Sequence, residues 1–194
     1  LCERQGRLRK EITKTRKKVP RGTFYHEWGK DMHIRKAEAQ DLDALIALIK
    51  RRMAWMDEQG IRQWNSTDYL GVYPPSYFLS RIEAGEIFVA QDEEICGMAA
   101  LLEEDDRWET HIPALYVHHL TADAAYPGTG AKLLRFAETK AVQEGLEAVR
   151  LDAQLGNGPL NAWYARQGYL PQGTMREGSY EGILREKLLK NRSC

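Results

Sequence analysis

Hydrophobic residues recur along the chain with two different periods, and the period predicts the type of each element. Apolar side chains three and four residues apart, as from Leu42 to Met56, line one side of a helix. Short apolar runs rich in β-branched residues, such as Ala114 to Thr121, predict strands. Four helices are expected, over residues 42–60, 76–84, 130–144 and 159–167. Seven strands are expected, over residues 33–37, 87–90, 95–102, 114–121, 149–153, 169–175 and 183–189.

The order of these elements predicts an α/β fold with a mixed central sheet. The expected order is one strand, two helices, three strands, a helix, a strand, a helix and two strands. Helices that stand between strands in the sequence cover the faces of a sheet. Residues 61–75 contain aromatic side chains and a Pro-Pro pair, so we expect a loop there. Loops of this length in a compact domain frequently bind ligands.

Length and composition narrow the class of protein. The 194 residues, 43% of them hydrophobic, can bury one core and are few for two domains. No apolar run approaches the roughly 20 residues that cross a bilayer, and the basic start has no apolar stretch typical of a secretory signal. We therefore expect a cytoplasmic protein without a membrane partner. Cys2, Cys96 and Cys194 have no metal-ligand spacing, so neither a disulfide framework nor a metal site is expected.

The net charge of zero conceals an uneven distribution. Residues 1–31 carry ten Lys and Arg against four Asp and Glu, whereas the remaining 163 residues carry eighteen against twenty-four. Because basic blocks are usually disordered, we expect residues 1–31 to be a flexible extension or an added leader, with Met32 as the native start and residues 32–194 as the domain. The competing hypothesis is an arm that binds nucleic acid. The acidic body, which contains no known recognition element, argues against nucleic acid as a partner.

Residues Ala125 to Leu134 read Ala-Tyr-Pro-Gly-Thr-Gly-Ala-Lys-Leu-Leu. They resemble the GNAT acetyltransferase signature Q/R-x-x-G-x-G/A, although Ala125 replaces Gln or Arg and Pro127 has no N–H to offer. Glycines let the backbone approach a diphosphate closely, and the positive end of the following helix attracts it. A glycine pair before a helix also occurs in ordinary loops. A Rossmann dinucleotide site fits worse, because Leu133 stands where G-x-G-x-x-G needs glycine. The resemblance places these residues around the coenzyme: Tyr126, Gly128, Thr129, Gly130, Ala131 and Lys132.

A second motif strengthens the resemblance. Asn157 to Tyr169 read Asn-Gly-Pro-Leu-Asn-Ala-Trp-Tyr-Ala-Arg-Gln-Gly-Tyr, which is similar to the family pattern N-x-x-A-x-x-L-Y-x-x-x-G-F. The resemblance extends over about residues 32–189 and implies the GNAT fold, a mixed sheet of about six or seven strands that is splayed at its middle and flanked by about four helices. It also implies an N-acetyltransferase that uses acetyl-CoA as co-substrate and acts on a primary amine of a small molecule or peptide.

The resemblance further implies roles for single residues. Backbone groups of Leu120, Thr121 and Ala122 would bond to the pantetheine arm in the splay, and Asn157 would face the pantetheine or adenosine end. Tyr164 would contact the coenzyme beside its sulfur and act as general acid toward the departing thiolate, because a phenol with a pKa near 10 is protonated at neutral pH. Each side chain also has a structural interpretation, Asn157 as a turn or helix cap and Tyr164 as a core residue of its helix.

His118 and His119 are the candidates for the base that takes a proton from the amine, since histidine titrates near neutral pH. Successive residues of a strand point to opposite faces, so at most one of the two can reach the cleft. We favour His118. Structural or surface roles are the alternative for both histidines, and Glu103 and Asp123 are reserve candidates for the base.

The acceptor is not identified by the sequence. Its pocket is expected at residues 61–77 and nearby strand ends, where Trp55, Trp64 and Tyr73 are apolar walls or, alternatively, core residues. Neither an acidic cluster for a polyamine nor an anion-binding group stands out. The departure at Ala125 is consistent with a rival function, a non-catalytic acyl-CoA sensor on the same fold, and the retention of Tyr164 argues for catalysis. Exposed late strands would allow a homodimer.

Overall fold

The structure is a computed structural model that describes residues 32–109 and 112–189. The basic extension expected at residues 1–31 lies outside these ranges. The helices are α1 (Leu42–Glu58), α2 (Tyr69–Val72), α3 (Pro75–Glu83), α4 (Thr129–Gln143) and α5 (Gly158–Arg166), with the 3-10 turns η1 (Ala39–Asp41) and η2 (Trp64–Ser66). The strands are β1 (His33–Lys36), β2 (Ile87–Gln91), β3 (Ile95–Leu102), β4 (Ala114–Ala122), β5 (Ala148–Gln154), β6 (Leu170–Glu177) and β7 (Tyr180–Leu188).

All seven predicted strands and the four predicted helices are present, which confirms the mixed α/β fold. The segment between α1 and α3 differs from the expected loop, because it folds into η2 and α2. Tyr69 is buried there, and its ring stacks on Trp64 with centroids 4.7 Å apart, so aromatic packing stabilises these short turns. Asp41 is the residue before α1 and is of a type that commonly caps helices. Its carboxylate accepts hydrogen bonds from Arg35 and the N–H of Glu38, however, and does not cap the helix.

The strands form one sheet in the order β1-β2-β3-β4-β5-β7-β6. β4 and β5 are parallel, and the other neighbours are antiparallel. Ala114–Val117 of β4 pair with Ala148–Leu151 of β5. β4 then continues to Ala122 and β5 to Gln154, past the last paired residues. The sheet therefore opens between these strands at their carboxyl ends, and the predicted splay is confirmed.

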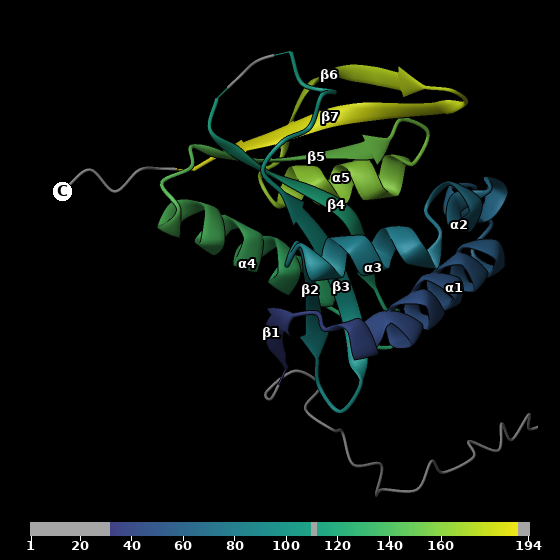
Figure 1. Ribbon diagram of the computed structural model, residues 1–194. Coiled ribbons are helices and arrows are strands. Elements are labelled where there is room, and N and C mark those ends of the chain that lie inside the picture. The colour runs from purple at the N-terminus through teal and green to yellow at the C-terminus, as the bar shows by residue number, and fades with distance from the viewer. Residues whose placement is uncertain (1–31, 110–111, 190–194) are drawn as a thin grey trace, which may run out of the picture.

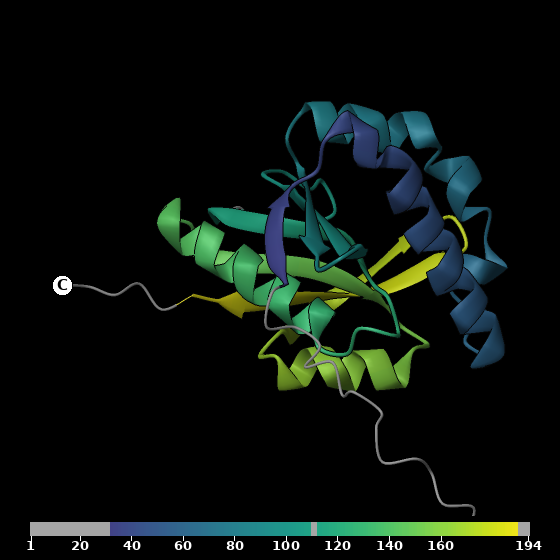
Figure 2. The same cartoon turned by 90° about the horizontal axis from the view of Figure 1, so that it is seen from below.

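Helices cover both faces of the sheet (Figures 1 and 2). We call the side that carries α1, α2 and α3 the α1 face, and the side that carries α4 and α5 the α4 face. Side chains of one strand alternate between them: Met98 and Ala100 of β3 belong to the apolar cluster on the α1 face, Ala99 and Leu101 to the cluster on the α4 face. The opening between β4 and β5 thus lies between two packed layers.

Within residues 32–109 and 112–189, each helix is too short or too polar to cross a bilayer. The same residues contain no group of three or more His, Cys, Asp or Glu side chains placed to hold a metal ion. β6 is an edge strand whose residues are mostly exposed. A cytoplasmic location, the lack of a metal and a homodimer stay predictions.

Candidate active site

The edge of β4 that faces the opening consists of backbone. Leu120, Thr121 and Ala122 lie past the last residue of β4 that pairs with β5. The N–H and C=O groups on this edge therefore form no hydrogen bonds to β5. Thr121 is buried, and its hydroxyl donates to the carbonyl of His119 at 2.9 Å. These three predicted residues therefore offer main-chain groups, which suit the amides of an extended ligand.

The N-terminus of α4 lies at one end of the opening. Gly128 is its N-cap, with φ 90°, a left-handed conformation that glycine adopts without strain. A Cβ at this position would meet nothing within 4 Å, so the space in front of the turn is open. The first N–H groups of a helix have no partner within the helix, and here the N–H of Lys132 bonds back to the Gly128 carbonyl at 3.1 Å. The N–H groups of Gly130 and Ala131 precede it and can bind an anion.

Close packing of β3 against α4 fixes this turn. Thr129 is fully buried, and its hydroxyl and its N–H both donate to the carbonyl of Tyr126, at 2.8 and 3.4 Å. A Cβ added to Gly97 of β3 would lie 2.4 Å from Cγ2 of Thr129, so the helix can start here only over a glycine. Thr129 therefore anchors the turn from inside. Sequence analysis missed Gly97, although a glycine inside a strand signals a close backbone approach.

Tyr164 of α5 belongs to the apolar cluster of the α4 face. Its side chain is 6% exposed, and its ring packs against Trp163 and Tyr169 with centroids 5.0 and 6.2 Å apart. No described residue accepts or donates a hydrogen bond at its hydroxyl. Among the described residues, the fully enclosed side-chain atoms without a hydrogen-bond partner are Trp108 Nε1 and Gln154 Oε1. The hydroxyl oxygen of Tyr164 is not one of them, so it still has access to solvent. The phenol can thus bond to a ligand in the opening.

The charges around Tyr164 come from both faces of the sheet. Burial raises the pKa of Tyr164 well above the usual phenol value, and Asp152 acts in the same direction, whereas Arg185 and Arg52 act against it. Arg52 belongs to α1 and Tyr164 to α5, so charges from both faces act on the phenol. With its raised pKa it stays protonated at neutral pH and can serve as a proton donor.

The two histidines of β4 depart from regular strand geometry. His119 has φ 53°, and the register between β3 and β4 shifts: Ala100 pairs with His118, but Met98 pairs with Thr121. β4 therefore holds one residue more than β3 between these pairs. The two imidazole centroids are 6.1 Å apart, on the α1 face. The prediction that these side chains point to opposite faces is wrong, because a β-bulge interrupts the alternation.

His119 is held by two tyrosines. The hydroxyl of Tyr69 lies 2.6 Å from Nδ1, the hydroxyl of Tyr77 lies 3.0 Å from Nε2, and the Tyr73 ring meets the imidazole edge-on at 4.7 Å between centroids. Burial and neighbouring positive charge lower the pKa of His119 to about 3. The ring is therefore neutral, donating to one hydroxyl and accepting from the other. A ring with so low a pKa is a poor base for an amine.

His118 has a carboxylate partner. Its Nε2 lies 3.0 Å from Oδ2 of Asp105. Arg107 pairs with two carboxylates: its Nε lies 2.8 Å from Oδ1 of Asp105, and its Nη1 lies 3.0 Å from Oδ1 of Asp152. Burial opposes ionisation of Asp105, but hydrogen bonds from His118 and Arg107 hold its pKa well below its usual range. A carboxylate that bonds to imidazole orients the ring. Sequence analysis missed this cluster, because an acidic loop with one arginine is usually solvated.

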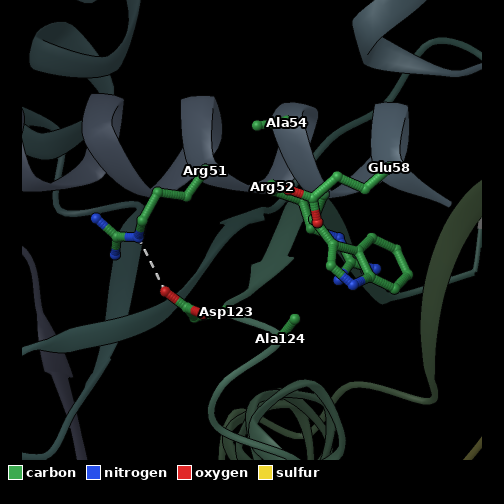
Figure 3. A pocket seen from close by; sticks show the side chains of 7 residues that line it. Arg51, Arg52, Ala54, Glu58, Asp123 and Ala124 are labelled. Atoms are coloured by element: carbon green, nitrogen blue, oxygen red, sulfur yellow. Dashed lines mark hydrogen bonds and ion pairs between the residues drawn. The ribbon is translucent and has the colours of Figure 1, made fainter.

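The reserve candidates for the base lie elsewhere. Glu103 is exposed and follows Leu102, which pairs with Tyr116 in the part of β4 that still pairs with β5. Asp123 follows β4, and its Oδ2 lies 2.9 Å from Nε of Arg51 (Figure 3). The choice of His118 over these two carboxylates as the base stays a prediction.

Asn157 caps α5. Its Oδ1 accepts from the N–H of Leu160 at 3.1 Å, and its Nδ2 donates to Oε1 of Gln63 at 3.1 Å. Gln63 belongs to the segment after α1, so this amide ties α5 to the α1 face. The structural interpretation of Asn157 is confirmed, and a contact with coenzyme stays a prediction.

The three aromatic residues predicted to line the acceptor pocket lie at two separate sites. Trp64, stacked on Tyr69, and Tyr73, against His119, pack onto the apolar cluster of the α1 face. Trp55 lies in a cavity between α1 and the residues after β4, with the guanidinium of Arg52 3.9 Å above its ring. Only Trp55 of the three lines this cavity.

Comparison with known proteins agrees with this geometry. The model of the acetyltransferase (GNAT) family matches residues 58–169, more than half of the chain. The uncharacterized N-acetyltransferase YesJ of Bacillus subtilis is 27% identical over 149 residues, which cover 72% of this chain and 82% of YesJ. A GNAT family acetyltransferase from Listeria monocytogenes has a TM-score of 0.66 at 24% identity, covering 81% of this chain and 95% of its own. PaiA N-acetyltransferase of Thermoplasma acidophilum, solved in complex with coenzyme A, has a TM-score of 0.66 at 20% identity, covering 81% and 98%.

Proposed function

The chain belongs to the acetyltransferase (GNAT) family, and from this membership and the site described above we propose that it transfers the acetyl group of acetyl-CoA to a primary amine of a small molecule or peptide. The observation that carries the proposal is the position of Tyr164. Its protonated phenol has no hydrogen-bond partner among the described residues and is affected by charges from both faces of the sheet, which supports a position at the opening.

Two main-chain features fit acetyl-CoA. The open turn at Gly128 and the first-turn N–H groups of α4 suit a diphosphate, and Lys132 adds a positive charge to the same turn. The edge of β4 at residues 120–122 suits the amides of the pantetheine arm. The departures at Ala125 and Pro127 remove one side chain and one N–H, and they leave the first turn of the helix intact.

The proposed reaction needs one proton donor and one proton acceptor. The amine nitrogen attacks the thioester carbonyl, so that an N–C bond forms, the C–S bond breaks, and the sulfur leaves with the bonding electron pair. Tyr164 donates its proton to this thiolate, because the phenol is protonated at neutral pH. The amine must also lose a proton, and His118, oriented by Asp105, is the proposed acceptor. Proton return through solvent to the phenolate leaves an amide and a free thiol as products.

The test combines coenzyme binding with catalysis. We expect calorimetry to show acetyl-CoA binding, and we expect thiol release that depends on an added primary amine. Binding without release across an amine panel would favour the non-catalytic sensor, to which the departure at Ala125 points. Failure to bind acetyl-CoA would overturn both functions. We also propose that residues 32–194 form the domain, so that deletion of residues 1–31 leaves acetyl-CoA affinity unchanged.

A further inference from the structure

A cavity of about 280 Å³ lies between the C-terminal half of α1 and the residues that follow β4. Figure 3 shows Arg51 and Arg52 reaching from α1 toward the chain at Asp123 and Ala124. The lining residues are Arg51, Arg52, Ala54, Trp55, Glu58, Asp123 and Ala124. Because Asp123 directly follows β4, the cavity adjoins the carboxyl end of the strand that borders the opening.

The charges of this cavity are unequally compensated. Arg51 is half exposed and pairs with Asp123 at 2.9 Å, and Glu58 is exposed at the surface of α1. Arg52 is partly buried and rests on the ring of Trp55, and none of the described carboxylates lies within 4.0 Å of it. A partly buried cation without an anion is unfavourable, and a bound carboxylate or phosphate would relieve this cost.

The position of Arg52 relative to the proposed general acid points to the acceptor. Burial lowers the pKa of Arg52, while Asp123 and Tyr164 act in the opposite direction. Arg52 in turn acts on the pKa of the Tyr164 phenol. Arg52 also lines the cavity beside Asp123 and Ala124, which directly follow β4, so one part of a small molecule bound at the guanidinium would lie beside the carboxyl end of the strand that borders the opening.

We propose that Arg52 binds a carboxylate of the acceptor, so that the amine substrate is an amino acid or a short peptide with a free carboxylate. This inference rests on the proposed acetyl transfer and specifies the class of its substrate. The planar guanidinium can bond to both oxygens of a carboxylate, and Trp55 holds its plane in place. A phosphate, with a charge of about −1.5 to −2, would call for more than one unpaired cation. The small volume of the cavity suits a short acceptor.

The experiment compares matched acceptors. Alanine, leucine and phenylalanine are each assayed beside their primary amides, with 1-aminoethylphosphonate as the phosphonate analogue of alanine, and thiol release is recorded. For the wild type we expect kcat/KM to be about 10- to 100-fold higher on the carboxylates, the value of a charge-assisted hydrogen bond. In Arg52→Met, which keeps an apolar chain over Trp55, we expect the KM of the amino acid to rise by this factor and the KM of acetyl-CoA to stay unchanged.

A control variant and a binding measurement separate the outcomes. Lys50→Met removes an exposed charge from α1 outside the cavity and should keep the preference. Equal rates on amides, a preference for the phosphonate, or weaker acetyl-CoA binding in Arg52→Met would each overturn the inference. If the wild type releases no thiol with any amine, the proposed transfer fails. Calorimetric titration of the three amino acids into the coenzyme-A-loaded protein then decides the role of Arg52: binding lost in Arg52→Met supports it, and no binding to the wild type overturns it.

Discussion

The two faces of the sheet are built on different principles. The α4 face buries an apolar cluster in which Leu133, Leu134 and Ala137 of α4 pack against alternate residues of the strands. The α1 face buries a comparable apolar cluster with an ion pair, Arg150 and Glu186 joined at 2.7 Å, whereas the buried Arg185 of the α4 face donates to the neutral amide of Asn161 at 3.0 Å. The proposed coenzyme contacts start from the first face, and the candidate acceptor residues lie mainly on the second.

This difference separates main-chain recognition from side-chain recognition. A diphosphate and a pantetheine arm can be bound by N–H and C=O groups whose positions follow from a turn, a helix start and an open strand edge. An acceptor amine must be distinguished by side chains, and those of the α1 face come from α1, the loop after β3 and the end of β4. The first kind of site follows from neighbouring residues in the sequence, and the second requires the tertiary fold.

The largest effect is expected at Tyr164, whose phenol is affected by charges from both faces. In Tyr164→Phe the ring still fills its place between Trp163 and Tyr169, but no proton is available for the thiolate. We expect turnover to fall about 10²- to 10⁴-fold while acetyl-CoA affinity changes little. Steady-state kinetics and calorimetry measure the two quantities. Unchanged turnover would remove Tyr164 from the mechanism.

The next effect tests how β3 holds the turn of α4. In Gly97→Ala the new methyl group collides with Cγ2 of Thr129, so we expect the free energy of unfolding to fall by about 1–3 kcal/mol and acetyl-CoA to bind more weakly. Urea denaturation and calorimetry measure both. Thr129→Ser removes Cγ2 and keeps the hydroxyl, so the double variant should recover most of the loss. Equal losses in the single and double variants would show that this contact does not position the turn.

The elements of the fold were predictable because their periodicity is local. The spacing of apolar residues from Leu42 to Met56 and the short apolar runs of the strands specify helix and strand without knowledge of their neighbours. α2 was missed, since a four-residue helix depends on the packing of Tyr69 and not on its own sequence. In the site, the turn at Gly128 and the position of Tyr164 were found through motifs whose spacing is short.

The acceptor side was less predictable, for a physical reason. The orientation of His119 depends on a register shift between β3 and β4, which a single strand does not reveal. Arg52 stands on a helix whose surface is otherwise solvated, and it lines a cavity only because Asp123 and Ala124 lie opposite. Such sites arise from contacts between segments far apart in the chain.

The polar interior of the α1 face should make stability depend on pH. His119 has a pKa of about 3 in the folded protein and near 6.5 when unfolded, so between these values the unfolded chain binds more protons. Stability is therefore fully present above about pH 6.5 and falls as the pH decreases, by at most about 1.4 kcal/mol per pH unit. The lowered pKa of Asp105 contributes only below its ordinary value of 3.8, so urea midpoints between pH 5 and 6.5 isolate the histidine.

A substitution at His119 checks the assignment. His119→Asn tolerates the left-handed backbone and cannot titrate, so its stability should depend less on pH in this window than that of the wild type. His33→Asn, at an exposed histidine of β1, is the matched control and should keep the wild-type slope. The assignment is contradicted if the two variants have the same slope.

The smallest effect concerns the amide that joins the faces. Asn157→Ala loses both the cap of α5 and the hydrogen bond to Gln63, and we expect the free energy of unfolding to fall by about 0.5–2 kcal/mol. Asn157→Asp keeps an oxygen for the N–H of Leu160 but has no donor for Gln63, so it separates the two contributions. If the Asp variant is as stable as the wild type, the cap accounts for the effect and the faces are held together by packing alone. If it is as unstable as the Ala variant, the hydrogen bond to Gln63 is the stabilising contact, and acceptor KM should then change in both variants, because residues 61–77 shift relative to α5.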